Sequence, residues 1–187
     1  MVDIKHVQSA LDNRFTREFG YPKKKAATKV KGHLTDDERE FLANSPFLVM
    51  ATSSADGTCD ASPKGGLPGF VKVLDDSHLL IPDVAGNKLF QSYLNISANP
   101  HIGLVFFIPG ARETFRVNGR AIIVDKAELD RLEVQLEVLN PDDNSKVLQG
   151  IMVEIEEAYG HCPRALVFSD IWDEQRISEN RGKPRRL

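Results

Sequence analysis

The sequence predicts a mainly β fold with flanking helices (α+β), in which a compact antiparallel barrel forms the core. Short apolar runs of strand type follow one another, as in residues 47–52, 70–74 and 79–81. Turn residues separate these runs, and Asp56-Gly57 is typical of a tight hairpin turn. Few helical patterns intervene, which favours an antiparallel barrel over a parallel sheet built from βαβ units.

Composition and charge restrict the class of protein. The chain has 187 residues, of which 41% are hydrophobic and 27% charged, as in one ordinary globular domain. A net charge of -3 argues against a protein that mainly binds nucleic acid. No apolar run approaches the ~20 residues needed to span a bilayer, and the first residues lack a signal-peptide pattern. We therefore expect a cytoplasmic protein in which Cys59 and Cys162 do not pair.

Three segments are expected along the chain. Residues 1–34 are interpreted as a helical arm and basic connector, residues 35–172 as the main domain, and residues 173–187 as a charged tail that frays.

The arm is expected to contain one helix that packs on the main body. Asp3 can cap it, an apolar face runs from Ile4 to Phe15, and Gly20 ends it. The lysine-rich stretch 23–31 is interpreted as a solvated connector, with binding of an anionic ligand or of nucleic acid as the alternative.

Two helices are predicted in the first half of the main domain. Thr35 and Glu38 match a capping box before a short helix that reaches about Ala43. The second is expected from Asn87 to Ser97, before Asn99-Pro100.

The second half offers one open choice and three further elements. Asn118-Gly119 predicts either a two-residue hairpin or a bulge in one long strand. Asp125 can cap a helix over residues 126–139. Residues 151–155 alternate like a half-buried strand, and Pro163 suits the first turn of a short helix.

Several kinds of chemistry find no motif in the sequence. There is no Gly-x-Ser-x-Gly elbow, no dinucleotide fingerprint, no phosphate loop and no metal-ligand spacing. The neighbouring His161 and Cys162 are not evidence of a catalytic pair, because adjacent residues in an extended chain project to opposite faces. We interpret them as a packed junction between strand and helix, name no catalytic side chain and expect no metal site.

One stretch predicts an anion site. The strand that ends at Pro82-Asp83 leads into Gly86-Asn87-Lys88, where a helix is expected to begin. Free backbone N–H groups, the helix dipole and an ammonium would then meet at one place. Lys64, which follows Ser62-Pro63 on an earlier strand, is a further candidate donor. The alternatives are a solvated lysine and an asparagine that only caps its helix.

Taken in order, the motifs of this chain resemble one known family. They closely resemble those of the pyridoxamine 5′-phosphate oxidase-like family of FMN-binding split barrels, and in particular of a bacterial subgroup of FMN-dependent enzymes. The resemblance covers about residues 35–172 and is carried by the following segments: Phe47 to Thr52, Ser62 to Gly65, Pro68 to Val71, Leu79 to Asp83, Gly86-Asn87-Lys88, Asn95-Ile96, Asn99 to Leu104, Arg116 to Ala121 and His161-Cys162.

The resemblance implies a split β-barrel homodimer with FMN at the subunit interface. It also implies two groups of site residues. The first surrounds the phosphate and ribityl chain and comprises Ser62, Lys64, Pro82, Asp83, Asn87 and Lys88, with Lys64, Asn87 and Lys88 on the phosphate. The second lies nearer the ring or the substrate mouth, with contributions from the partner chain, and comprises Asn118, His161, Cys162 and Trp172.

The implied activity is electron or hydride transfer through FMN to a small molecule, without a nucleic-acid or membrane partner. After Trp172 the chain lacks the Arg-Leu-His run with which the true oxidase binds pyridoxal phosphate. The resemblance therefore implies the cofactor site but leaves the substrate open. A non-catalytic flavin- or haem-binding carrier or sensor is the alternative.

Overall fold

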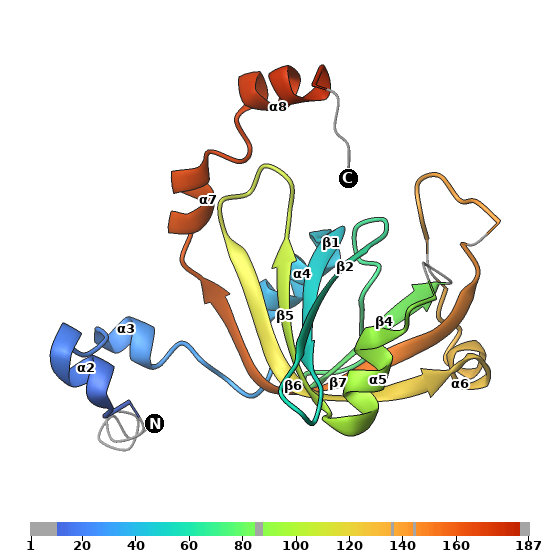
Figure 1. Ribbon diagram of the computed structural model, residues 1–187, viewed down its shortest axis with the longest axis horizontal. Helices are drawn as coiled ribbons and strands as arrows, with labels where there is room; N and C mark the ends of the chain where they lie inside the picture. The colour runs from blue at the N-terminus through green and yellow to red at the C-terminus, as the bar shows by residue number, and fades with distance from the viewer. Residues whose placement is uncertain (1–10, 85–87, 136, 144, 184–187) are drawn as a thin grey trace.

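The protein folds as one strongly curved antiparallel sheet with helices around it, as a computed structural model shows (Figure 1). The structure describes residues 11–84, 88–135, 137–143 and 145–183. Within these residues seven strands pair in the order β2-β1-β5-β6-β7-β4-β3. The strands are β1 (Phe47–Ser53), β2 (Cys59–Gly65), β3 (Lys72–Val73), β4 (His78–Val84), β5 (His101–Phe107), β6 (Thr114–Asp125) and β7 (Val147–His161).

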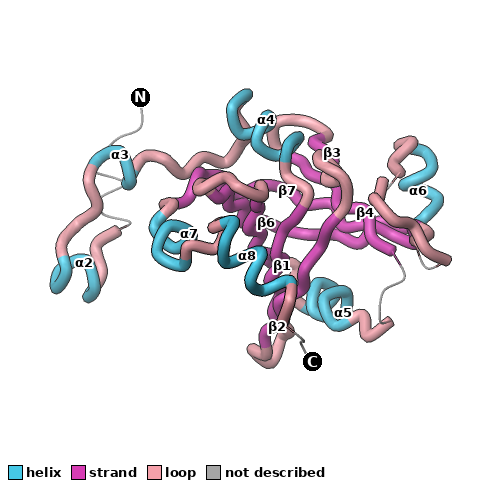
Figure 2. Tube along the Cα trace, turned by 90° about the horizontal axis from the view of Figure 1, so that it is seen from above, coloured by secondary structure: helices cyan, strands magenta, loops and turns pink. Residues whose placement is uncertain are grey.

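Seven helices accompany the sheet in the described ranges. They are α2 (Arg14–Phe19), α3 (Lys24–Ala27), α4 (Asp36–Asn44), α5 (Gln91–Ala98), α6 (Lys126–Arg131), α7 (Arg164–Ser169) and α8 (Glu174–Arg181). Figure 2 shows α5 close to β2, whereas α2 and α3 lie well away from the strands.

The core fills the concave side of the sheet. Alternate residues of β1 and β5 point inward, and Leu48, Met50, Leu104 and Phe106 are fully buried there. Helix α4 adds Leu42 to the same cluster. Burial of each such side chain stabilises the fold by roughly 1.5–3 kcal/mol, so the two-residue period of these strands determines which face turns inward.

Strand β6 resolves the choice at Asn118-Gly119. It continues through this dipeptide, pairs with β7 along its whole length, and shifts register between Asn118 and Gly119. The long strand with a bulge is confirmed and the hairpin is wrong. A Cβ on Gly119 would lie 2.0 Å from the carbonyl oxygen of Glu154, so the bulge brings two backbones too close for any other residue.

The predicted hairpin between β1 and β2 is confirmed. Ser53 pairs with Cys59 next to the Asp56-Gly57 turn, and Gly57 has a φ of 89°. The capping box at α4 also forms, with the Thr35 N–H donating to Glu38 Oε2 at 2.8 Å.

Two helices differ from their predicted bounds. Helix α5 begins at Gln91 and not at Asn87, because Lys88 and Phe90 adopt left-handed backbone angles with φ of 59° and 53°. Asn87 itself lies outside the described residues. Helix α6 ends at Arg131 and does not reach Leu139, and Glu133 beyond it is again left-handed, with φ of 54°.

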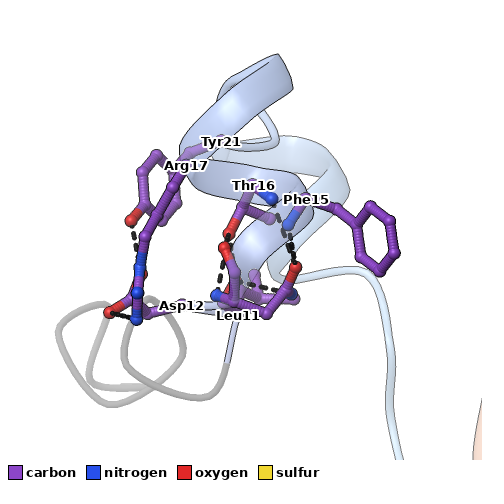
Figure 3. A network of polar contacts seen from close by, with 7 residues as sticks. Leu11, Asp12, Phe15, Thr16, Arg17 and Tyr21 are labelled. Carbon is purple, nitrogen blue, oxygen red and sulfur yellow. Dashed lines mark hydrogen bonds and ion pairs between the residues drawn. The ribbon is translucent and has the colours of Figure 1, made fainter.

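The arm also departs from its prediction. Asn13 is extended and caps a separate helix, accepting hydrogen bonds from the N–H groups of Phe15 and Thr16 (Figure 3). A continuous helix through this point is therefore wrong. Phe15 and Phe19 are 61% and 77% exposed, so these side chains do not pack on the main body. The connector touches the sheet at Lys31, which bridges to Ala158.

The C-terminal segment contains a capped helix, α8. Asp173 caps α8 by accepting from the N–H of Arg176 at 2.8 Å. Trp172 donates from Nε1 to the carbonyl oxygen of Ala111 at 2.8 Å, which fixes the link between α7 and α8 to the loop before β6.

Candidate functional site

A cavity of about 500 Å³ opens where the sheet fails to close on itself. Strand β2 forms one edge of the sheet, and β4 lies next to the other edge, so the two strands are not hydrogen-bonded neighbours. Residues of β2, β4, the start of α5 and the segment before it line the space between them. The split in the barrel is thus the place where polar side chains from distant parts of the chain meet.

The alternation of β2 sets the cavity wall. Asp60, Ser62 and Lys64 are half-buried, and the residues between them are exposed. Ser62, Lys64, Pro82, Asp83 and Lys88, all expected from the sequence, do line this one cavity.

An ion pair joins the two sides of the split. Lys64 Nζ lies 2.8 Å from Asp83 Oδ2, and the two side chains are only 16% and 14% exposed. The hydroxyl of Tyr93, on α5, donates to the same Asp83 oxygen at 2.8 Å. One carboxylate oxygen therefore connects β2, β4 and α5.

The Tyr93 hydroxyl keeps the proton that it donates to Asp83. Its burial, followed by the negative charge of Asp83, raises the pKa of the Tyr93 hydroxyl well above its ordinary value. The phenol therefore stays protonated throughout the physiological range and holds the orientation of the Asp83 carboxylate.

A second carboxylate lies at the first turn of α5. The hydroxyl of Ser92, which is buried, donates to Asp60 Oδ2 at 2.5 Å. The N-terminus of this helix therefore already has a negative partner from β2. Sequence reasoning placed an anion site at a helix start near Asn87; the helix begins later, at Gln91, and the anion site itself stays a prediction.

The charges around the cavity balance. Asp60 and Asp83 carry two negative charges, Lys64 and Lys88 two positive ones. Lys88 is exposed, and among the described residues no carboxylate pairs with it. The cation that is available to an incoming anion is therefore Lys88 and not the paired Lys64.

An apolar wall completes the cavity. Phe70 and Pro82 both line the cavity and are buried, and the rings of Phe90 and Tyr93 meet edge to face with centroids 6.0 Å apart. Flat apolar surface next to hydrogen-bonding groups suits a planar, amphipathic ligand.

The second group of predicted residues lies elsewhere in this chain. Asn118 donates to Glu157 Oε2 at 2.7 Å on the outer side of β6 and β7. The ring of His161 lies 6.3 Å from that of Tyr159, and Cys162 is exposed. Trp172 lines a separate hollow of about 460 Å³ with Arg112. Within the described residues, none of these four lines the cavity at the split.

Other kinds of site find little support in the described ranges. Their His, Cys, Asp and Glu residues form no cluster of three that could hold a metal ion. Cys59 and Cys162 are both free. Among the helices that the structure describes, none has the length and apolar character to cross a membrane.

Sequence reasoning missed Asp60, Phe70, Ser92 and Tyr93. Asp60 had a usable signal, because it continues the alternation of Ser62 and Lys64 on β2. Tyr93 had none, since its position in a helical apolar pattern predicts core packing and not a polar contact with β4.

The sequence profile of the pyridoxamine 5′-phosphate oxidase family matches residues 34–162. The chain belongs to this family. The match includes β1 to β7 and every strand that lines the cavity. The family recognised from the order of motifs is confirmed, as is the split-barrel fold with a sheet that does not close.

Solved structures agree on the fold. A pyridoxamine 5′-phosphate oxidase homologue from Lactobacillus delbrueckii is 23% identical, with a TM-score of 0.51, and the alignment covers 71% of this chain and 99% of that one. HupZ from Group A Streptococcus is 18% identical, with a TM-score of 0.51 and coverage of 68% and 93%. A search of curated proteins found no match.

Proposed function

We propose that this family member binds FMN in the cavity at the split of the barrel and uses it to oxidise or reduce a small molecule. The observation that carries the proposal is the cavity itself. It joins an aromatic and proline wall to two lysines, two carboxylates and three hydroxyls, within a family that is described as pyridoxamine 5′-phosphate oxidase.

The residues present fit a flavin mononucleotide. A volume of about 500 Å³ lies in the usual range for cofactor-sized ligands. The flavin ring is flat and largely apolar, like the surface of Phe70, Pro82 and Phe90. The phosphate needs a cation without a partner, and Lys88 at the start of the α5 segment meets that need.

The protein would supply binding, orientation and exclusion of water. Bound FMN carries the redox chemistry, namely hydride transfer at its ring. Tyr93 and Lys64 hold Asp83 in one orientation, and Phe70 closes the inner side of the cavity. No described side chain in the cavity is assigned as a proton donor to substrate.

The proposal includes a homodimer. The outer face of β1 and β5 is apolar, with Phe47 opposite Phe107 and Val49 opposite Val105. Asn118 lies on β6, the neighbour of β5, and His161 lies one strand further, on β7. A second copy that covers the apolar face would bring its own Asn118, His161, Cys162 and Trp172 toward the flavin, in agreement with the two groups expected from the sequence.

The first test is a visible absorbance spectrum of the purified protein, followed by identification of any released chromophore. We expect a flavin spectrum with one FMN per chain, or stoichiometric uptake of added FMN. A Soret band would indicate haem instead, and a colourless protein that takes up no FMN would contradict the proposal.

A second test addresses the cavity. Replacing Lys64→Ala together with Lys88→Ala should weaken FMN binding by at least tenfold, since each lysine offers a charge-assisted hydrogen bond. Lys23→Ala with Lys25→Ala changes the net charge equally on the arm and serves as the control. Equal FMN affinity in both double variants would place the flavin elsewhere.

A further inference from the structure

The Lys64–Asp83 pair is the feature of the cavity that flavin binding alone does not explain. It spans the split of the barrel, is nearly buried, and presents both signs of charge to the same space.

One carboxylate oxygen of Asp83, Oδ1, accepts no hydrogen bond from the described residues. Both hydrogen bonds that this carboxylate accepts from described residues, from Lys64 and Tyr93, go to Oδ2. Because no fully buried side-chain oxygen or nitrogen in the described ranges lacks a partner, Oδ1 is not fully buried, and Asp83 is one of the residues that line the cavity.

Lys64 is in a similar position. Its ammonium has three donors and uses one of them on Asp83. A donor on Lys64 and an acceptor on Asp83 therefore lie side by side, in a geometry that the Tyr93 hydroxyl fixes from a third element.

A phosphate suits this pair poorly. An anion that reached Lys64 would also approach the Asp83 carboxylate, and like charges repel strongly in a partly buried site. An uncharged group with a donor next to an acceptor satisfies both residues without adding charge.

We propose, building on the FMN-binding function above, that Lys64 and Asp83 recognise an uncharged donor–acceptor group of the flavin and not its phosphate. Two parts of a flavin have this chemistry: the ribityl hydroxyls and the imide edge of the ring. The phosphate is left to Lys88. The pair thus selects for flavin, and Lys88 selects for its phosphorylated form.

The test compares three ligands that differ in these groups. FMN has the phosphate, riboflavin lacks it, and lumiflavin lacks the ribityl chain as well. Dissociation constants are measured by flavin fluorescence for the full-length wild type, Lys64→Met and Lys88→Met.

Lys64→Met should weaken the binding of FMN and of riboflavin by the same factor, roughly ten- to a hundredfold, since a hydrogen bond to a charged group is lost from both. Lys88→Met should weaken FMN alone.

The lumiflavin measurement separates the two sources. If Lys64→Met also weakens lumiflavin binding, the Lys64–Asp83 pair contacts the ring edge. If only FMN and riboflavin bind more weakly to this variant, the pair contacts the ribityl chain. Either result supports the inference. A Lys64→Met variant that loses FMN but keeps riboflavin would overturn it, while FMN binding by the wild type would still stand.

Lys64→Met leaves Asp83 without its cation and could impair folding. The double variant Lys64→Met with Asp83→Leu removes both charges, and circular dichroism checks its fold. The affinity of this double variant for FMN and for riboflavin should fall by equal factors. Riboflavin affinity at the wild-type level would also overturn the inference. A wild type that binds none of the three flavins would remove the proposed function and this inference together.

Discussion

Gly119 marks the point where β6 shifts register against β7, and the two backbones approach so closely there that a side chain at this position has no room. A Cβ would meet Glu154 O at 2.0 Å, and that oxygen belongs to backbone that cannot rotate away. We expect Gly119→Ala to lower the free energy of unfolding by about 1–3 kcal/mol in denaturant titrations. Gly160→Ala is the control, since a Cβ there meets nothing within 4 Å. Equal stability of the two variants would contradict the model of a tight bulge.

Asp12 gives a second prediction at the scale of single residues (Figure 3). Hydrogen bonds from Arg17 and then Tyr21 lower the pKa of the Asp12 carboxyl to about 2. A lowered folded-state pKa means that the contact is fully present above the ordinary carboxyl pKa, near 3.9, and is lost as pH falls through about 2. An NMR titration of the Asp12 carboxyl carbon should show this midpoint.

Replacing Arg17→Met should raise the Asp12 midpoint toward the ordinary value, because the largest contribution disappears. Arg14→Met removes the same charge from a residue that contacts the ring of Phe15 and should leave the midpoint in place. An Asp12 midpoint that does not respond to Arg17→Met would show that the arm does not hold this contact in solution.

At the scale of elements, sequence patterns predicted the features that depend on interactions between residues close in the chain. The α4 capping box and the β1–β2 hairpin depend on residues within a few positions of each other, and both formed as expected. The hairpin rule at Asn118-Gly119 failed because β7 offers β6 a ladder from Thr114 to Asp125, which outweighs one tight turn.

The candidate site shows the same division. Ser62, Lys64, Pro82 and Asp83 were expected together and do line one cavity, because each lies on a strand beside the split. The Tyr93 contact with Asp83 and the Ser92 contact with Asp60 arise only when α5 packs between distant strands. No spacing in the sequence records that packing. The start of α5 was misplaced by four residues, because Lys88 and Phe90 before Gln91 have left-handed backbone angles.

The C-terminal helices provide the prediction at this scale. Neither α7 nor α8 has a buried residue, so the Trp172 hydrogen bond to Ala111 is a main attachment of this segment. Trp172→Phe keeps an aromatic ring but removes the donor. We expect faster amide exchange across residues 164–181, with little change in the exchange of β1 and β5. Phe168→Leu, at an exposed position on α7, is the matched control. Unchanged exchange in Trp172→Phe would mean that other contacts hold these helices.

At the scale of the whole molecule, the sheet has two faces with different roles. The concave face holds the core, and one end of it opens into the cavity. The convex face of β1 and β5 is apolar and only partly covered in a single chain, and it lies between the two groups of residues that the family resemblance assigns to one site. The proposed dimer across this face would account for both observations, because it would cover the apolar strands and join the two groups.

Charge placed on this face should therefore separate the subunits. Val105 is half-buried at the centre of the face, opposite Val49 and Arg116. In Val105→Lys, an ammonium would have to be buried without a partner at the interface, which costs more than a small dimer contact can offset. We expect sedimentation velocity to give a dimer for the wild type and a monomer for Val105→Lys, with FMN affinity reduced at least tenfold because the partner's residues are lost. Leu139→Lys, at an exposed loop position, adds the same charge and should remain a dimer with unchanged affinity. A monomeric wild type that binds FMN tightly would show that the cavity of one chain is sufficient.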